Sequence, residues 1–146
     1  MIAAWGGRSD GKSGLIVVGG ERNMDGSAMK VSFDGCKTWE LLGNKSLFSW
    51  EYGAPGPVVD AWGDTIVVYA APGPDLGVGT TFNFYASIDA GATWTEITPA
   101  DVSTSSGRLP GSRFAANPSG ALVDRVNTKM IWLSFGGRSD AVVTFD

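Results

Sequence analysis

Short runs rich in β-branched and aromatic residues recur along the chain, and clusters of Gly, Pro, Ser and Asp-Gly separate them. Runs of this length with such boundaries predict β-strands, and helical periodicity is nowhere sustained. The clearest predicted strands cover residues 15–18, 28–32, 39–42, 65–70, 80–87, 93–97, 130–135 and 141–145. Weaker candidates cover 2–5, 57–61 and 121–124. The pattern therefore predicts an all-β protein.

One strand ending occurs three times in the chain. In each copy an apolar strand ends in Ser or Thr, one further residue and Asp; the copies are segments 30–34, 85–89 and 142–146. Successive copies are about 55 and 57 residues apart. Upstream of each copy, an apolar strand ends in a pair of small residues, at 19–20, 70–71 and 136–137. A unit of four antiparallel strands repeated at this period is typical of β-propeller blades.

Two turns that follow this strand ending carry a longer motif. Residues 32–39 read Ser-Phe-Asp-Gly-Cys-Lys-Thr-Trp, and residues 87–94 read Ser-Ile-Asp-Ala-Gly-Ala-Thr-Trp. Both resemble the Asp box, S/T-x-D-x-G-x-T-W, of sialidases and other propellers, although the first has Cys36 where glycine is expected and its glycine one position earlier. The resemblance implies that Asp accepts hydrogen bonds from its own turn, Gly takes a positive φ, and Trp lies between blades. It assigns this structural role to Ser32, Asp34, Gly35, Thr38, Trp39, Ser87, Asp89, Gly91, Thr93 and Trp94.

A Gly-Gly pair after an apolar strand, with a tryptophan downstream, resembles the kelch repeat. The best match runs from Trp94 through Arg113 to residues 130–137. Together the two resemblances imply one segment of four-stranded blades over residues 1–146, with blade 1 at about 1–43, blade 2 at about 54–98 and an incomplete blade 3 at about 113–146.

Three blades from one chain cannot close a ring, because propellers typically have four to eight blades and an open arc exposes apolar faces and strand edges. Two explanations stay open at this point. Either two chains form a homodimer that completes a six-bladed ring, with residues 1–5 replacing the missing strand, or the sequence is an excerpt of a longer parent chain.

Charge and composition exclude several kinds of partner and site. The net charge is -4, the pI is about 4.7 and the basic residues are scattered, which argues against nucleic acid and against an anionic membrane. Cys36 is the sole cysteine and histidine is absent, so disulfides, multi-thiolate zinc sites, imidazole metal ligands and Ser-His or Cys-His nucleophile pairs are excluded. No signal peptide or long apolar run occurs in these residues, and the compartment stays open.

Residues 6–13 match the phosphate-binding pattern G-x-x-x-x-G-K-S. Phosphate binding by this motif needs a helix directly after the lysine, whereas residues 14–20 are strongly β in character. The triplet Arg-Ser-Asp at 8–10 also recurs at 138–140, after another Gly-Gly. We therefore expect a hairpin loop here and no nucleotide site.

In a propeller, the loops on the face opposite the Asp-box turns form the usual ligand site. In this chain those loops carry Arg22, Trp50, Tyr52, Arg108, Arg113 and Arg138. Aromatic and guanidinium groups suit a sugar or a carboxylate-bearing ligand through stacking and bidentate hydrogen bonds. The alternative is that the aromatic residues pack the loops and the arginines are solvated.

The resemblance to sialidases implies an arginine triad, a tyrosine with a glutamate partner and an acidic acid/base, but Arg113-Phe114 and Glu51-Tyr52 do not reproduce that set. Glycoside hydrolysis needs two facing carboxylates, and the loosely placed candidates are Glu21, Asp25, Glu51 and Asp75. The sequence thus predicts no catalytic residue, metal or cofactor, and a non-catalytic binding or scaffold module for carbohydrate or protein. Two alternatives remain: a fragment of a sialidase-like hydrolase that holds a substrate carboxylate with Arg108 or Arg113, and a purely structural unit without a ligand.

Overall fold

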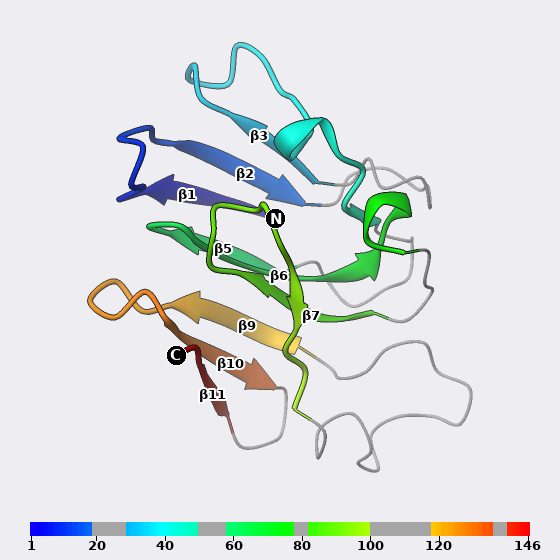
Figure 1. The fold of residues 1–146 in the computed structure, drawn as a ribbon, viewed down its shortest axis with the longest axis vertical. Coiled ribbons are helices and arrows are strands. Elements are labelled where there is room, and N and C mark those ends of the chain that lie inside the picture. The colour runs from blue at the N-terminus through cyan, green and yellow to red at the C-terminus, as the bar shows by residue number, and fades with distance from the viewer. Residues whose placement is uncertain (19–28, 50–57, 78–81, 100–117, 136–139) are drawn as a thin grey trace.

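The computed structural model describes residues 1–18, 29–49, 58–77, 82–99, 118–135 and 140–146. Within them, the chain forms β-strands and two short 3-10 helices, η1 (Leu42–Asn44) and η2 (Pro74–Leu76), as Figure 1 shows. The predicted all-β class is confirmed. In these ranges no helix has both the length and the apolar character that crossing a membrane requires.

The strands form three antiparallel groups that follow one another along the chain. The first group contains β1 (Ile2–Gly6), β2 (Gly14–Val18) and β3 (Met29–Ser32). The second contains β5 (Val58–Trp62), β6 (Thr65–Pro72), β7 (Asn83–Ser87) and β8 (Thr95–Glu96), and the short β4 (Phe48–Ser49) pairs with the end of β6. The third contains β9 (Pro118–Val123), β10 (Met130–Phe135) and β11 (Ala141–Thr144).

The first strands of the three groups lie next to one another. A short parallel pairing, Trp5 with Ala61 and Gly6 with Trp62, joins β1 to β5, so the first two groups form one curled sheet in the order β3-β2-β1-β5-β6-β7-β8. The third group is a separate sheet, and its β9 contacts β5. In Figure 1, β1 and β9 point the same way, as do β2 and β10.

Two apolar cores fill the spaces between the groups. The first core lies between groups one and two and includes Trp5, Ile16, Val31, Phe48 and Val68. The second core lies between groups two and three and includes Tyr69, Phe84, Ile131, Leu133 and Phe135. Tyr69 and Phe84 lie with ring centroids 5.0 Å apart, and Phe84 meets Phe135 edge-on at 5.7 Å.

Strand β6 supplies side chains to both cores. Ile66, Val68 and Ala70 enter the first core, while Val67, Tyr69 and Ala71 enter the second. All six are fully buried. Since successive side chains of a strand point to opposite faces, the unbroken apolar run at 66–71 reports a strand that is covered on both sides.

One strong strand prediction was wrong, and one strand was missed. Residues 39–42 contribute only an isolated bridge between Glu40 and Val31, and η1 begins at Leu42. Gly43 and Asn44 both take a positive φ there, 62° and 56°, which turns the chain away from the sheet. The missed strand is the two-residue β4, whose Phe48 is buried in the first core.

Trp5 joins the first two groups through both its ring and its indole nitrogen. Its side chain is 1% exposed, and Nε1 donates a hydrogen bond of 2.9 Å to the Gly63 carbonyl oxygen. We expect Trp5→Ala to lower the free energy of unfolding by about 3–5 kcal/mol, because it removes a large core side chain and leaves a cavity. Urea unfolding followed by circular dichroism measures this change. Val126→Ala, at a side chain that is 97% exposed, is the control and should stay within about 0.5 kcal/mol of the parent; equal effects of the two substitutions would contradict the placement of Trp5.

Candidate functional site

The six residues predicted to face a ligand, Arg22, Trp50, Tyr52, Arg108, Arg113 and Arg138, lie outside the described residues. The same holds for Glu21, Asp25 and Glu51 among the carboxylates considered for hydrolysis. Asp75 is described, and its Oδ2 accepts a hydrogen bond of 2.6 Å from the backbone N–H of Ser46. That contact gives Asp75 a structural role between two loop segments.

The turn after β3, here called the Asp34 turn (residues 32–39), is held by the carboxylate of Asp34. Oδ1 accepts hydrogen bonds from the backbone N–H groups of Lys37 and Thr38 and from the Ser32 hydroxyl, each 3.0 Å long. Oδ2 accepts a 2.6 Å hydrogen bond from the Thr38 hydroxyl. These hydrogen bonds, chiefly those from the Thr38 hydroxyl and N–H, lower the pKa of Asp34 from 3.8 to about 2.

The turn after β7, the Asp89 turn (residues 87–94), repeats this arrangement. Asp89 accepts hydrogen bonds from the Ser87 hydroxyl at 2.8 Å, the Thr93 N–H at 2.9 Å and the Thr93 hydroxyl at 2.6 Å. The Ser87 hydroxyl oxygen in turn accepts from the Gly91 N–H at 2.8 Å. Desolvation acts to raise the pKa of Asp89, but the hydrogen bonds from Thr93 and Ser87 outweigh it and the pKa is lowered.

The displaced glycine of the Asp34 turn does not change these hydrogen bonds. Gly35 and Cys36 take positive φ values of 73° and 69°, and Ala90 and Gly91 take 58° and 92°. Both turns therefore place two successive residues in the left-handed region, one of them a non-glycine residue. The backbone geometry is shared although the glycine sits at a different position in each.

The tryptophans that follow the two turns have different surroundings. Trp94 is partly buried, donates a hydrogen bond from Nε1 to the Gly91 carbonyl oxygen, and meets Phe48 edge-on with centroids 4.7 Å apart. It thus packs against the first core, between groups one and two. Trp39 is 37% exposed, because it lies on the first group, where no further group covers it in the described part of the chain.

The third copy of the strand ending also differs in its placement. Ser32 and Ser87 are each 2% exposed, whereas Thr144 is exposed on β11. On β11 it is Val143 and Ala141 that pack against the second core. The preceding residue behaves alike in all three copies, since Val31, Ala86 and Val143 each pack in or against a core, so the third copy differs only in the exposure of its Ser/Thr position.

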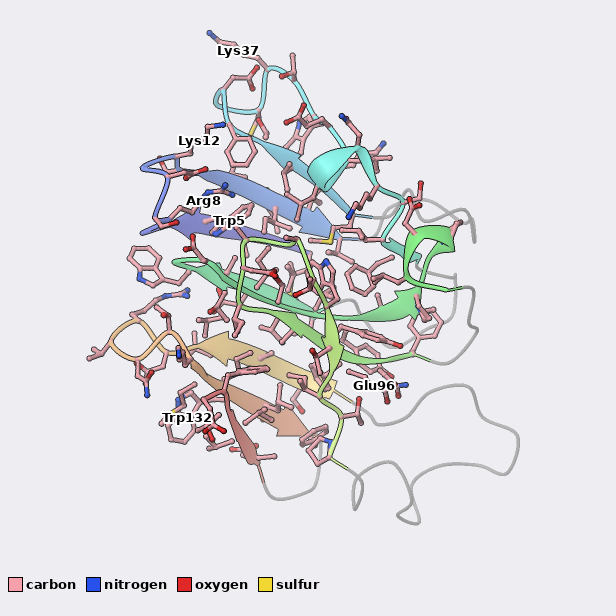
Figure 2. All side chains as sticks on the ribbon, in the orientation of Figure 1. Trp5, Arg8, Lys12, Lys37, Glu96 and Trp132 are labelled. Atoms are coloured by element: carbon pink, nitrogen blue, oxygen red, sulfur yellow. The ribbon has the colours of Figure 1, made fainter. Side chains whose placement is uncertain are left out.

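The segment at 6–13 is a hairpin loop, as predicted. β2 begins at Gly14 directly after it, so no helix follows Lys12. The Arg8 guanidinium lies 3.8 Å from the Trp5 ring centroid and donates two hydrogen bonds to the Asp10 carboxylate, of 2.9 Å and 2.6 Å. Figure 2 shows Arg8 and Trp5 side by side at this end of the first group. The bonded Arg8 guanidinium, with the Lys12 N–H, holds the pKa of Asp10 well below its ordinary value.

A second arginine–tryptophan contact joins groups two and three. Asp60 is 8% exposed, and its carboxylate accepts a 2.9 Å hydrogen bond from Arg125 and a 2.8 Å hydrogen bond from the Val123 N–H. Arg125 lies 5.1 Å from the Trp62 ring centroid. These residues were not predicted. A Trp-Gly pair recurs at 5–6 and 62–63, and this repeat could have pointed to Trp62 but not to Asp60 or Arg125.

An apolar hollow of about 240 Å³ lies on the outward face of the third group. It is lined by Gly120, Ala121, Leu122, Trp132, Leu133, Ser134 and Asp140. Trp132 is 45% exposed, so one face of its ring is free to stack or pack. Figure 2 shows Trp132 on this sheet. The hollow offers an aromatic surface beside one carboxylate and one hydroxyl, a set suited to packing and hydrogen bonding.

Within the described ranges, no group of three or more His, Cys, Asp and Glu side chains is placed to hold a metal ion. No protein-family model, curated protein or solved structure matches this chain.

The two turns offer a matched pair of glycine substitutions. A methyl group at Gly35 would meet no atom within 4 Å, whereas one at Gly91 would collide with the Leu42 side chain. We expect Gly35→Ala to cost about 1–2 kcal/mol from the left-handed backbone alone. Gly91→Ala should cost about 1–3 kcal/mol more, because overpacking is added. Urea unfolding of the two variants measures the difference, and equal costs would contradict the contact between Leu42 and Gly91.

The lowered pKa of Asp34 sets the sign of a pH effect. A carboxylate whose pKa is lower in the folded chain than in the unfolded chain stabilises the fold at pH values above its ordinary pKa. For Asp34 this contribution is lost as the pH falls from about 4 to about 2. We therefore expect Asp34→Asn to destabilise the chain at pH 7 and to have progressively less effect over that range. Urea unfolding of parent and variant at a series of pH values measures it. A difference that stays constant from pH 7 to pH 2 would show that the negative charge is not what holds the turn.

Proposed function

We propose that the chain is a segment of β-propeller-type blades that acts as a non-catalytic binding or scaffold module. The observation that carries the proposal is the placement of β5 between β1 and β9. The first strand of each antiparallel group lies beside the first strand of the next, and the groups stack through apolar faces. Propellers are built in this way, with the first strand of each blade nearest a common axis and the blades covering one another's faces.

The shared turn geometry supports the same conclusion. The Asp34 and Asp89 turns close the third strands of two successive groups with the same set of carboxylate hydrogen bonds. Asp34 and Asp89 are thereby engaged in holding their turns, which agrees with the structural role that the Asp-box resemblance implies. The Trp94 ring between the first two groups matches the position expected of the motif's tryptophan.

Six of the described carboxylates support a non-catalytic role in a similar way. Asp10, Asp34, Asp60, Asp75, Asp89 and Asp124 each accept hydrogen bonds from backbone or side-chain donors of the chain itself. General acid/base catalysis needs a carboxyl group whose pKa lies near the working pH. The pKa values of Asp10, Asp34, Asp89 and Asp124 are shifted the other way, below their ordinary value.

We assign ligand binding to the predicted ligand face because of the types of residue that it carries. We expect the purified chain to retain a glycan or protein in glycan-array and pull-down screens. Replacing both Trp50 and Tyr52 with Ala should reduce that binding at least about tenfold, since each stacked aromatic ring contributes about 1 kcal/mol. Val126→Ala is the control and should leave binding unchanged.

The same preparation tests the alternatives. Turnover of a fluorogenic sialoside that is lost in Arg113→Ala would favour the hydrolase fragment and contradict the proposal. A folded protein that binds no glycan or protein in either screen would favour the alternative of a purely structural unit without a ligand. An experimental structure in which β9 does not lie beside β5 would refute the propeller arrangement itself.

A further inference from the structure

The connection from the first group to the second carries the triplet Asn44-Lys45-Ser46. Asparagine, any residue except proline, and then serine or threonine is the acceptor sequence for N-linked glycosylation. The chain contains it once, because the similar triplet at Asn117 has Pro118 in the middle. So short a sequence does not make an acceptor site by itself, and the structure around Asn44 has to provide the rest.

Asn44 lies at the surface, at the end of η1, and is exposed. Its φ of 56° is in the left-handed region, which asparagine adopts more readily than most residues. Its backbone N–H donates a hydrogen bond of 3.0 Å to the Leu41 carbonyl oxygen, but no described residue bonds to its side-chain amide. A methyl group at the preceding Gly43 would meet no atom within 4 Å beyond its chain neighbours. The amide nitrogen of Asn44 therefore stands in open space.

The turn that carries Asn44 is anchored on both sides. Before it, Leu42 packs against the first core, and after it, Leu47 is buried in that core. The Ser46 N–H donates a 2.6 Å hydrogen bond to the Asp75 carboxylate, and the Ser46 carbonyl oxygen accepts one of 3.2 Å from the Asp75 N–H. A group attached to Asn44 would therefore project from a fixed position on the fold.

The Ser46 hydroxyl takes no part in this anchoring. Both hydrogen bonds to Asp75 use the Ser46 backbone, and within the described ranges no partner bonds to the hydroxyl. The hydroxyl at the third position is the part of the acceptor sequence that glycosylation requires besides the asparagine. The fold thus leaves both side chains of the acceptor sequence unengaged.

We propose that Asn44 is an acceptor site for an N-linked oligosaccharide. In the transfer, Nδ2 of Asn44 forms a bond to C1 of the first sugar of a lipid-pyrophosphate-linked oligosaccharide, bound to an oligosaccharyltransferase. The bond from C1 to the pyrophosphate oxygen breaks, the lipid pyrophosphate leaves with the electron pair, and the amide gives up one proton. The inference goes beyond the proposed function and does not depend on it.

The folded chain has room for the sugar at this turn. Figure 1 shows η1 beside β3, apart from β9, β10 and β11. A glycan is bulky and hydrophilic, so it is tolerated where it stays in solvent. Asn83 provides the contrast, because it is 8% exposed and pairs with Ala70 inside the second group. Sugar attached there would have to bury hydroxyl groups or break the sheet.

Production of the full chain behind a cleavable leader in a eukaryotic secretory host tests the inference. We expect the mass of the chain to increase by one oligosaccharide. An N-glycosidase that turns a glycosylated asparagine into aspartate should remove the increase and mark position 44. The modified chain should keep the β circular dichroism spectrum and the urea midpoint of the chain made without sugar, because the sugar lies outside both cores.

Two substitutions at Ser46 separate glycosylation from folding. Ser46→Ala should abolish the mass increase and leave the spectrum and the urea midpoint unchanged, since the hydroxyl bonds to no described residue. Ser46→Thr keeps a hydroxyl at the third position and should keep the modification. Asn127→Gln, at an exposed asparagine outside any acceptor sequence, should leave the modification unchanged.

A displaced acceptor sequence tests whether the position of the turn matters. Tyr85→Thr, combined with Ser46→Ala, creates the acceptor sequence at Asn83 and removes it at Asn44. We expect sugar at Asn83 to prevent formation of the β spectrum. The same double variant made without sugar measures the cost of the substitutions alone. Equal folding of this variant with and without sugar would show that burial at Asn83 is irrelevant, which contradicts the structural argument.

Three results would overturn the inference. One is parent chain, secreted or retained in the cell, that carries no sugar at Asn44. Another is a mass increase that persists in Ser46→Ala. The third is a modified parent chain without a β spectrum while Ser46→Ala folds.

If neither chain folds in the secretory host, accommodation is measured in vitro. Asn44→Cys is combined with Cys36→Ser, because Cys36 is exposed and would react as well. The purified chain is then coupled to an iodoacetamide derivative of a disaccharide. We expect the β spectrum and the urea midpoint to stay unchanged on coupling, and loss of the spectrum would overturn the inference. None of these results touches the proposed function, which fails separately if an experimental structure does not place β1, β5 and β9 side by side.

Discussion

The structure depends on one constraint: an apolar sheet face is stable only when a second layer covers it. Strand β6 shows this most directly, since Ile66, Val68 and Ala70 enter one core and Val67, Tyr69 and Ala71 enter the other. Fully burying a side chain such as Ile66 or Val68 is worth about 1.5–3 kcal/mol, which is large beside the net stability of a domain. Among the described residues, the second group is covered on both sides by its neighbours, and each of the outer two groups is covered on one side.

Polar contacts define how the groups lie on one another once the apolar faces are together. The Trp5 indole N–H donates to Gly63, and the Asp60 carboxylate accepts from Arg125 and from the Val123 backbone. Each contact joins two groups and satisfies a polar atom that would otherwise be buried without a partner. Apolar burial supplies the attraction between groups, while these hydrogen bonds select one arrangement of the strands.

The functional interpretation follows from the difference between the middle and the ends of the stack. The carboxylates of Asp34 and Asp89 accept hydrogen bonds from their own turns, so they stabilise those turns and are poorly suited to catalysis. Leu122, Trp132 and Val142 remain about half exposed in a row, although the Trp132 side chain also hydrogen-bonds to Asp124. The proposed binding or scaffold role therefore relies on the surfaces and loops that the sheets present.

The sequence by itself determined the all-β class, most of the strands and the chemistry of both turns, because strand alternation and turn stereochemistry are local properties. It did not determine the single bridge at Glu40, the short β4 or the pairing of Asp60 with Arg125, which depend on groups distant along the chain. The strand at 130–135 has apolar residues on both faces, so local pattern could not tell which face would be buried. Tertiary packing decided that Ile131, Leu133 and Phe135 enter the second core and that Trp132 stays outside, because only the position of the second group specifies which side is covered.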